Sequence, residues 1–412
     1  MATLAQAVET PTVDPLDVSR AELYRDDVWQ EPFRTLRATS PVHRTEHSDF
    51  GPYWSISTYK PIVAVESQPE LFSSEAGGIT LADFIEERHD VRMPMFIAMD
   101  RPKHTGQRRT VSPAFTPSEM VRMTDNIRMR TAEILDSLDW NKEFDWVDTV
   151  SIELTTQMLA ILFDFPWEDR RKLTFWSDWA GDIELVKNEE LRLERLQHMY
   201  ECGGYFQNLW NQKLGKPPTP DLISMMMHSD AMAEMDQMEF LGNLILLIVG
   251  GNDTTRNTMS AIAYGLNLFP DERAKLEADP SLIQNTVQEV IRWQTPLAHM
   301  RRTATADTEL EGQQIKAGDK LALWYLSANR DESVFENADK IIVDRPNARR
   351  HLAFGHGIHR CVGARLAELQ IAVLLEEMAK RRMRVNVLGE PTRVAACFVH
   401  GYRTLPVEIS KY

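Results

Sequence analysis

Cysteine is scarce in this chain. Only three occur among its 412 residues, at Cys202, Cys361 and Cys397. A sparse, odd and widely spaced set does not make the paired pattern of a disulfide framework. The count therefore argues against a disulfide-stapled secreted domain, and we expect a reducing compartment, the cytoplasm.

Long hydrophobic runs are also missing. The longest apolar run covers residues 244–249, whereas a membrane helix needs roughly 18 to 20 apolar residues. The N-terminal segment lacks the apolar core of a secretory signal peptide. We therefore expect no membrane span.

An excess of basic residues is absent as well. Lys and Arg total 46 against 61 Asp and Glu, which gives a formal net charge of −15. Bulk nucleic-acid binding needs a basic face, so no nucleic-acid partner is expected. No internal repeat or Ser/Gly-rich linker divides the chain, and we predict one domain over residues 28–412 after a loosely ordered lead over residues 1–27.

Helical periodicity dominates what is present. Residues 117–282 read as successive helices separated by prolines, including one helix over 236–269 that would be roughly 50 Å long. Short strand patterns follow near 308–325 and from 382 to 409. The fold class expected is mainly α with small β-sheets. Residues 73–97 form a long irregular stretch rich in apolar side chains, which is usual for functional loops.

The most unusual stretch is residues 354–363, which read F-x-x-G-x-x-x-C-x-G and contain three glycines. The helix predicted after it is apolar almost all round and therefore buried. Cys361 would lie at the N-terminus of that helix, where the dipole and free N–H groups favour a thiolate. Such a thiolate is a nucleophile or a metal ligand; the alternative is a buried free cysteine in a glycine-rich turn.

A second pattern lies in the middle of the long helix, where Gly250 and Gly251 precede Asp253 and Thr254. Two glycines inside a helix cost roughly 2 kcal/mol relative to alanine, which is understandable if another group must approach the backbone there. An acid followed by an alcohol can position water and deliver protons. The alternative is a kinked core helix in which the hydroxyls bond back to the helix itself.

These two motifs resemble the haem-binding loop and the oxygen-activation motif of the cytochrome P450 superfamily. The resemblance implies a monooxygenase that binds haem b and O₂. Cys361 would be the axial iron ligand, in a loop that includes Phe354 and Gly363. Gly250 and Gly251 would face the haem, with Thr254 as the catalytic alcohol and Asp253 in the proton path.

Further stretches agree with the resemblance. Glu289 and Arg292 match the family's E-x-x-R pair, with Arg345 as the expected third, structural member. Buried haem propionates need cations, and the resemblance assigns this role to five side chains, with Arg301 as the alternative to the arginine that follows it. They are His104, Arg108, Arg302, His351 and His359.

A narrower likeness concerns the substrate. Residues 77–80, 250–258, 295–302 and 398–403 resemble the soluble bacterial alkane hydroxylases of the superfamily. We therefore expect hydroxylation at the terminal carbon of medium-chain n-alkanes or fatty acids. The alternatives are a hydroxylase of a terpene or another small hydrophobic compound and, in a different class, a haem-binding sensor without turnover. The predicted substrate-pocket residues are Ile79, Leu81, Phe84, Leu244, Leu247, Ile248, Leu297, Phe398 and Val399.

The chain contains no flavin- or ferredoxin-like segment. We therefore expect electrons from separate partners, a ferredoxin and an NAD(P)H-dependent ferredoxin reductase. Basic side chains near the cysteine are candidates for the docking patch of the ferredoxin. They are Arg109, Arg349, Arg350, Arg360 and Arg365.

Overall fold

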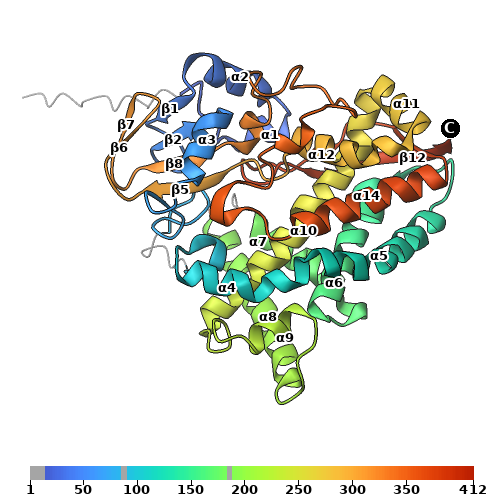
Figure 1. Cartoon of the computed structure of the whole chain (residues 1–412), viewed down its shortest axis with the longest axis horizontal. Helices are drawn as coiled ribbons and strands as arrows, with labels where there is room; N and C mark the ends of the chain where they lie inside the picture. The colour runs from blue at the N-terminus through green and yellow to red at the C-terminus, as the bar shows by residue number, and fades with distance from the viewer. Residues whose placement is uncertain (1–13, 85–90, 183–187) are drawn as a thin grey trace, which may run out of the picture.

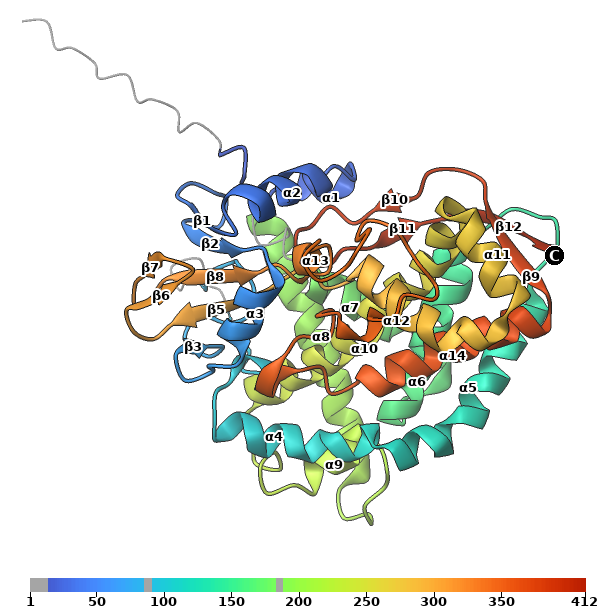
Figure 2. The ribbon, with the colours of Figure 1, turned by 45° about the horizontal axis from the view of Figure 1, so that its top comes forward.

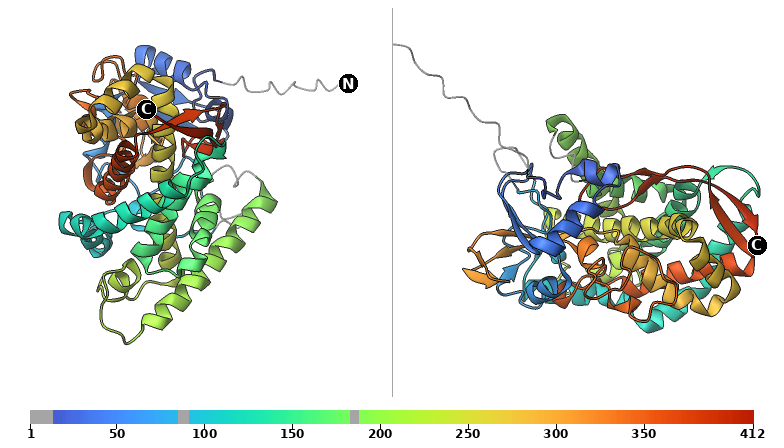
Figure 3. Two further views of the ribbon diagram at one scale, coloured as in Figure 1. Left: turned by 90° about the vertical axis from the view of Figure 1, so that its right-hand side faces the viewer. Right: turned by 90° about the horizontal axis from the view of Figure 1, so that it is seen from above.

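The computed structural model describes residues 14–84, 91–182 and 188–412. Helices make up most of it, and the long helix α10 (Gln237–Leu268) runs through the middle of the molecule (Figure 1). Viewed from above, the main group of strands lies at one end and the C-terminus at the other (Figure 3). The expectation of a mainly α fold with small β-sheets is confirmed.

The remaining elements have the following bounds. The other α-helices are α1 (Ala21–Arg25), α2 (Gln30–Thr39), α3 (Tyr59–Glu66), α4 (Lys103–Val111), α5 (Pro117–Ser137), α6 (Glu153–Phe163), α7 (Arg171–Gly181), α8 (Glu189–Lys213), α9 (Leu222–Met227), α11 (Pro270–Ala278), α12 (Ile283–Gln294), α13 (Tyr325–Ala328) and α14 (Ala364–Lys380). Short 3₁₀ turns are η2 (Phe96–Ala98), η3 (Ser112–Phe115), η5 (Trp167–Asp169), η7 (Pro280–Leu282), η8 (Ala348–Arg350) and η9 (Gly357–His359), and η4 (Val147–Ile152) is a π-helical turn. The strands are β1 (Val42–Thr45), β2 (Tyr53–Ile56), β3 (Phe72–Ser73), β4 (Phe144–Asp145), β5 (Met300–Ala304), β6 (Thr308–Leu310), β7 (Gln313–Ile315), β8 (Lys320–Leu323), β9 (Met383–Val387), β10 (Thr392–Arg393), β11 (Tyr402–Thr404) and β12 (Pro406–Lys411).

Helix α10 begins where the sequence predicts. The Asp236 side chain caps it by accepting hydrogen bonds from the backbone N–H groups of Met238 and Glu239, at 2.9 and 2.8 Å. Because most of its residues are buried, tertiary packing rather than intrinsic propensity stabilises it. It contacts α6, α7, α8, α12 and α14, so side chains on opposite faces of α10 reach different parts of the interior.

The largest sheet has five strands in the order β1-β2-β8-β5-β3. Strands β2 and β8 are parallel and the other neighbours are antiparallel. The sheet stands beside helix α3 (Figure 2). Successive side chains of β5 point to opposite faces, and this alternation separates Arg301 from Arg302 in the site described below.

The N-terminal segment differs from the expectation. Val18 and Tyr24 are almost fully buried, and the Tyr24 hydroxyl donates to the Val18 carbonyl at 2.8 Å. The Tyr53 hydroxyl of β2 donates to the Asp17 carboxylate at 2.9 Å. The prediction of a loosely ordered lead is therefore wrong for residues 14–27, because apolar side chains there join the core. Residues 1–13 lie outside the described residues.

Within the described ranges, no helix is both long enough and apolar enough to cross a bilayer.

Candidate active site

The loop around Cys361 turns on two glycines. Gly355 and Gly357 have φ values of +68° and +66°, which side chains with a Cβ rarely adopt. A Cβ on Gly357 would also overlap the carbonyl oxygen of Glu66 in α3. The loop closes where the Cys361 N–H donates to the Phe354 carbonyl at 2.8 Å. The glycines that the sequence singled out therefore have a geometric cause.

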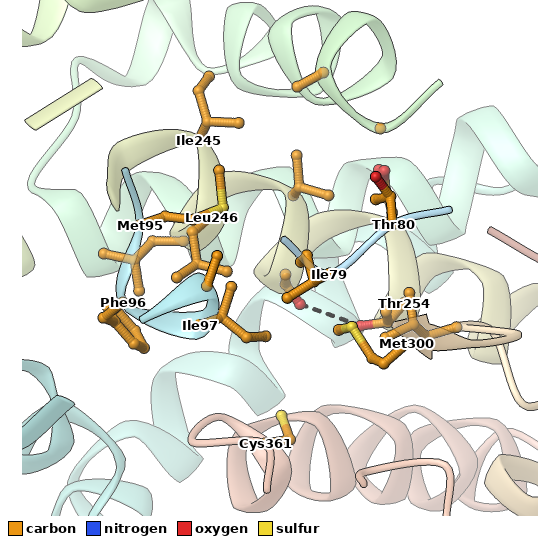
Figure 4. A pocket seen from close by; sticks show the side chains of 18 of the residues that line it. Ile79, Thr80, Met95, Phe96, Ile97, Ile245, Leu246, Thr254, Met300 and Cys361 are labelled. Carbon is orange, nitrogen blue, oxygen red and sulfur yellow. Dashed lines mark hydrogen bonds between the residues drawn. The ribbon is translucent and has the colours of Figure 1, made fainter. Parts of the chain in front are cut away.

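Cys361 lies three residues before the start of α14, and its sulfur points into a cavity (Figure 4). Burial raises the pKa of the Cys361 thiol, while the Gly363 N–H and the charges of Arg108 and Arg360 lower it. Three groups thus favour the thiolate against the cost of burial. A coordinated metal deprotonates a thiol outright, so this environment suits a ligand more than a free nucleophile.

The middle of α10 lies across the cavity from Cys361. Gly250 and Thr254 line the cavity one turn apart, and the Thr254 hydroxyl donates to the Gly250 carbonyl at 3.1 Å (Figure 4). A Cβ on Gly250 would meet no atom of the described part of the chain within 4 Å, so this glycine leaves open space beside the threonine. The back-bonding expected of a mid-helix hydroxyl is present, but it leaves the oxygen in the wall of the cavity.

A glycine is needed at position 251 for a different reason. A Cβ there would come within 2.7 Å of Leu159 Cδ2 on α6. The second glycine therefore allows close packing of α10 against α6, although it also borders the cavity. We expected both glycines to leave space for another group beside the helix. Gly250 does so at the cavity, whereas Gly251 is needed because a side chain there would clash with Leu159 in the core.

Asp253 is buried and well connected. Its Oδ1 accepts from the Ser177 hydroxyl at 2.8 Å and from the Asn252 amide at 3.1 Å, and Arg256 lies 3.1 Å from the same oxygen. Arg256 also pairs with Asp178, whose side chain is half-exposed, at 2.5 Å. Burial raises the pKa of Asp253 to about 6. This carboxyl can thus exchange protons near neutral pH, and a chain of charged groups leads from it toward solvent.

A cluster of basic side chains borders the opposite edge of the cavity. His104 and Arg108 come from α4, Arg302 from β5 and His359 from the cysteine loop, and all four line the cavity. The imidazole rings of His104 and His359 lie 4.3 Å apart. Burial lowers the pKa of His104 to about 4, with Arg108 adding to the effect.

The cluster fits a bound anion. Among the described residues, no hydrogen-bond partner exists for either ring nitrogen of His104 or His359, although all four nitrogens are buried. Buried polar atoms are nearly always satisfied, so their partner is expected to be a ligand. Carboxylates placed here would accept from the two rings and from Arg108 and Arg302, as the propionates of haem require. Arg301 also borders the cavity, where its guanidinium pairs with Asp83 at 2.7 Å, and the preference for Arg302 as the propionate ligand stays a prediction.

His351 is not part of this cluster. Its Nε2 lies 3.3 Å from the Gln288 side chain of α12, and its Nδ1 accepts from the Ala353 N–H at 3.2 Å. Its ring packs against Phe354, with the ring centroids 5.4 Å apart. His351 does not line the cavity with the other four predicted propionate residues, and both of its ring nitrogens already have partners in the chain.

The predicted structural triad is confirmed. Arg292 and Glu289 form a fully buried pair at 2.8 Å, and Arg345 Nε lies 2.9 Å from both carboxylate oxygens of Glu289. The Arg292 guanidinium also donates to the carbonyls of Asn329 and Ala338. The triad thus fixes α12 to the chain that leads into the cysteine loop.

The cavity has a volume of about 940 Å³ and a mainly apolar wall. Six of the nine predicted substrate residues line it: Ile79, Phe84, Leu247, Leu297, Phe398 and Val399. The predictions for Leu81, Leu244 and Ile248 are wrong, because these side chains are fully buried in the hydrophobic core.

Sequence reasoning missed several side chains that stand close to the cysteine. Figure 4 shows Met300 beside Thr254, and Ile97 and Leu246 in the wall above Cys361. Leu246 carried a usable signal, since it lies on the same α10 face as Gly250 and Thr254 at intervals of four residues. Met300 and Ile97 had none, because their positions depend on the sheet and on the loop.

The loop over the cavity is held by α10. The Asn243 side chain accepts from the Phe96 N–H at 3.0 Å and donates to Gln107 of α4 at 3.2 Å. A Cβ on Gly242 would overlap the Pro94 carbonyl, so helix and loop backbones touch there. These contacts fix residues 93–97 in the cavity wall and were not foreseen from the sequence.

Comparisons with known proteins agree with this geometry. The family model described as cytochrome P450 matches residues 206–381. Linalool 8-monooxygenase from Pseudomonas putida is 34% identical over 95% of this chain and 98% of its own length. A methyl-branched lipid omega-hydroxylase from Mycobacterium tuberculosis is 32% identical over 99% of this chain and 98% of its own. The solved structure of CYP153D17 from Sphingomonas sp. PAMC 26605 is 89% identical, with a TM-score of 0.93 over 97% of this chain and 100% of that one. The chain therefore belongs to the cytochrome P450 family and is a haem b-dependent monooxygenase.

Proposed function

We propose that this cytochrome P450 hydroxylates the terminal carbon of medium-chain n-alkanes or fatty acids. The observation that carries the proposal is the mainly apolar wall around Cys361. Ile79, Ile97 and Met300 contribute to it, and Thr254 and Thr80 are polar side chains labelled in the same view (Figure 4). A hydrocarbon chain needs such a surface.

Terminal selectivity must come from position, because a terminal C–H bond is stronger than an internal one. The wall segments that would restrict the chain end are fixed from outside the cavity. The Arg301 N–H donates to the Ile79 carbonyl at 2.8 Å, and Asn243 holds Phe96 next to Ile97. A rigid wall of this kind can present one carbon at a time, as catalysis by orientation requires. The omega-hydroxylase among the relatives supports this reading.

Haem supplies the activation of O₂ when it is bound, and the chain supplies its surroundings. We propose that Cys361 binds the iron through its thiolate, and that His104, Arg108, Arg302 and His359 hold the propionates. Apolar side chains would exclude water from the substrate, and Thr254 would hold a proton-bearing hydroxyl at the open space beside Gly250.

Asp253 is proposed to resupply protons to Thr254. Its pKa of about 6 keeps both protonation states accessible near neutral pH. Arg256 links it to the half-exposed Asp178. Since a guanidinium keeps its own proton, the transfer itself would run between carboxyl groups and water while Arg256 holds them in place.

Electrons are proposed to arrive from a ferredoxin and its NAD(P)H-dependent reductase. Arginines flanking the cysteine loop would form the docking patch for the acidic ferredoxin, and each of them is exposed. They are Arg109, Arg349, Arg350, Arg360 and Arg365. The cytoplasmic location expected from the sequence stays a prediction.

A second candidate is a terpene hydroxylase. Linalool 8-monooxygenase is 34% identical over nearly the whole chain, and the same apolar wall would accept a branched isoprenoid. The two candidates differ in shape rather than polarity, so only the product distribution separates them.

The test uses the holoenzyme with a ferredoxin, its reductase and NADH. Dodecane, lauric acid and linalool are supplied separately, and products are identified by gas chromatography with mass spectrometry. We expect 1-dodecanol or 12-hydroxylauric acid as the main product. Oxidation of linalool alone would favour the second candidate, and hydroxylation only at internal carbons would exclude terminal selectivity.

A further inference from the structure

Glu66 is a buried carboxylate with no part in the chemistry described so far. It ends helix α3, and its side chain is 1% exposed. Its Oε1 accepts from the Tyr325 hydroxyl at 2.6 Å and from Arg302 at 3.2 Å, and its Oε2 accepts from the His356 N–H at 2.8 Å. One carboxylate therefore joins α3, β5, α13 and the cysteine loop.

Both oxygens of Glu66 face donors that can compensate a negative charge. Burial raises the pKa of Glu66 above its ordinary value, and Arg302, Tyr325 and the His356 N–H reduce that rise. Carboxylates that accept several hydrogen bonds in an enclosed site are stabilised in their charged form. Its backbone also matters, since the Glu66 carbonyl occupies the space that a Cβ on Gly357 would need.

The position of Arg302 gives this carboxylate a consequence beyond packing. Arg302 is one of the four basic residues whose arrangement fits the haem propionates, and its guanidinium also donates to the Arg301 carbonyl at 2.8 Å. The Arg302 guanidinium therefore contacts Glu66 on one side and borders the cavity on the other. Neutralising Glu66 would leave Arg302 with more uncompensated positive charge toward the cofactor.

We propose that Glu66 is a positioning residue that fixes Arg302 and the turn of the cysteine loop, and that its negative charge lowers the reduction potential of the bound haem. Reduction adds an electron to the haem, so a nearby negative charge opposes it and a nearby positive charge favours it. Groups outside the ligand shell commonly tune a metal site in this way. The inference rests on the assignment of Arg302 to a propionate, and it is independent of the substrate.

The test compares two variants that separate charge from packing. Glu66→Gln removes the charge and keeps the shape, whereas Tyr325→Phe removes a donor to the same oxygen and keeps the charge. Haem-loaded proteins are titrated with dithionite in a spectroelectrochemical cell at fixed pH without substrate. At a given applied potential, we expect Glu66→Gln to increase the ratio of reduced to oxidised haem about tenfold. This corresponds to a positive shift of the reduction potential by about 59 mV for one electron. Tyr325→Phe should give no comparable positive shift.

A third variant covers the case in which Glu66→Gln does not retain haem. Arg302→Gln removes the cation and leaves Glu66 uncompensated, so its potential should move to more negative values. Transfer of haem to apomyoglobin is measured in parallel, and faster loss from Arg302→Gln would support the propionate assignment by itself.

The outcomes distinguish the proposed role of Glu66 from the assignment of Arg302 to a propionate. Unchanged potentials in both Glu66→Gln and Arg302→Gln would overturn the inference and leave Glu66 a packing residue. Equal positive shifts in Glu66→Gln and Tyr325→Phe would also overturn it, because loop distortion rather than charge would then explain them. Unchanged haem transfer from Arg302→Gln would instead refute the propionate assignment.

Discussion

The substitution Asp253→Asn should make the protein more stable at pH 8 while it slows turnover. All three contacts given above for this carboxylate end on Oδ1. An asparagine can keep its oxygen there and place its amide group toward Gly181. The change therefore removes a buried charge and keeps the hydrogen bonds from Ser177 and Asn252.

The magnitude follows from the raised pKa. Burial moves the pKa of Asp253 from 3.8 to about 6, so the folded state holds this proton more tightly than the unfolded state. The free energy of unfolding therefore falls as pH rises from about 4 to about 6, by about 1.4 kcal/mol per unit or about 3 kcal/mol in all. Asparagine has no such titration and avoids this loss. Arg256 keeps Asp178 as a partner in the variant.

The assay is urea unfolding of the haem-loaded proteins, followed by circular dichroism between pH 5 and pH 8.5. The stability difference should be about 1.5 kcal/mol at pH 5 and approach about 3 kcal/mol at pH 8. Turnover should fall roughly a hundredfold if Asp253 transfers protons. Asp178→Asn is the matched control, since it removes a carboxylate from the other side of Arg256 and should not stabilise. An Asp253→Asn protein less stable than the parent at pH 8 would refute the reasoning.

Other predictions use contacts elsewhere in the molecule. Gly242→Ala places a Cβ against the backbone of the cavity loop and should lower the free energy of unfolding by about 1–3 kcal/mol. The control is Gly203→Ala in α8, whose Cβ would lie 3.3 Å from a leucine methyl; it should be neutral or stabilising in the same urea titration. Arg345→Ala leaves Glu289 with one cation and should cost about 3–5 kcal/mol; a thermal midpoint equal to that of the parent would contradict this. Thr254→Ala should consume NADH with more hydrogen peroxide and less alcohol, and unchanged coupling of NADH to product would remove the threonine from the proton path.

Local sequence patterns predicted the parts of the site that lie within one segment of the chain. The glycines of the cysteine loop, the capped start of α10 and the Glu289–Arg292 pair all depend on neighbours a few residues away. Arg345 is more distant, and it was found through the resemblance and not through periodicity. His351 shows the limit of that route, because a residue ten positions before the cysteine does not line the cavity and contacts Gln288 of α12 instead.

The substrate wall was the least predictable part. Leu244 and Ile248 are as apolar as Leu246, yet they lie on the core side of α10. At about 100° per residue they stand roughly 120° and 160° around the helix from Gly250, whereas Leu246 stands roughly 40° from it. Composition cannot distinguish these faces. A helical wheel centred on Gly250 would have done so, whereas no local rule places Met300 or Ile97.

The sequence by itself determined the helical architecture, the poised cysteine and the acid–alcohol pair, because each depends on contacts within a turn or two of the chain. Only the tertiary structure decided which basic side chains line the cavity and which glycine is required for packing against the core. It also decided that Glu66 contacts Arg302 and the cysteine loop. Glu66 and its partners Arg302 and His356 are more than two hundred positions apart in the sequence, and Gly251 and Leu159 are about ninety apart. These contacts exist only when packing of the whole core has fixed the distances between segments, and no local pattern encodes such distances.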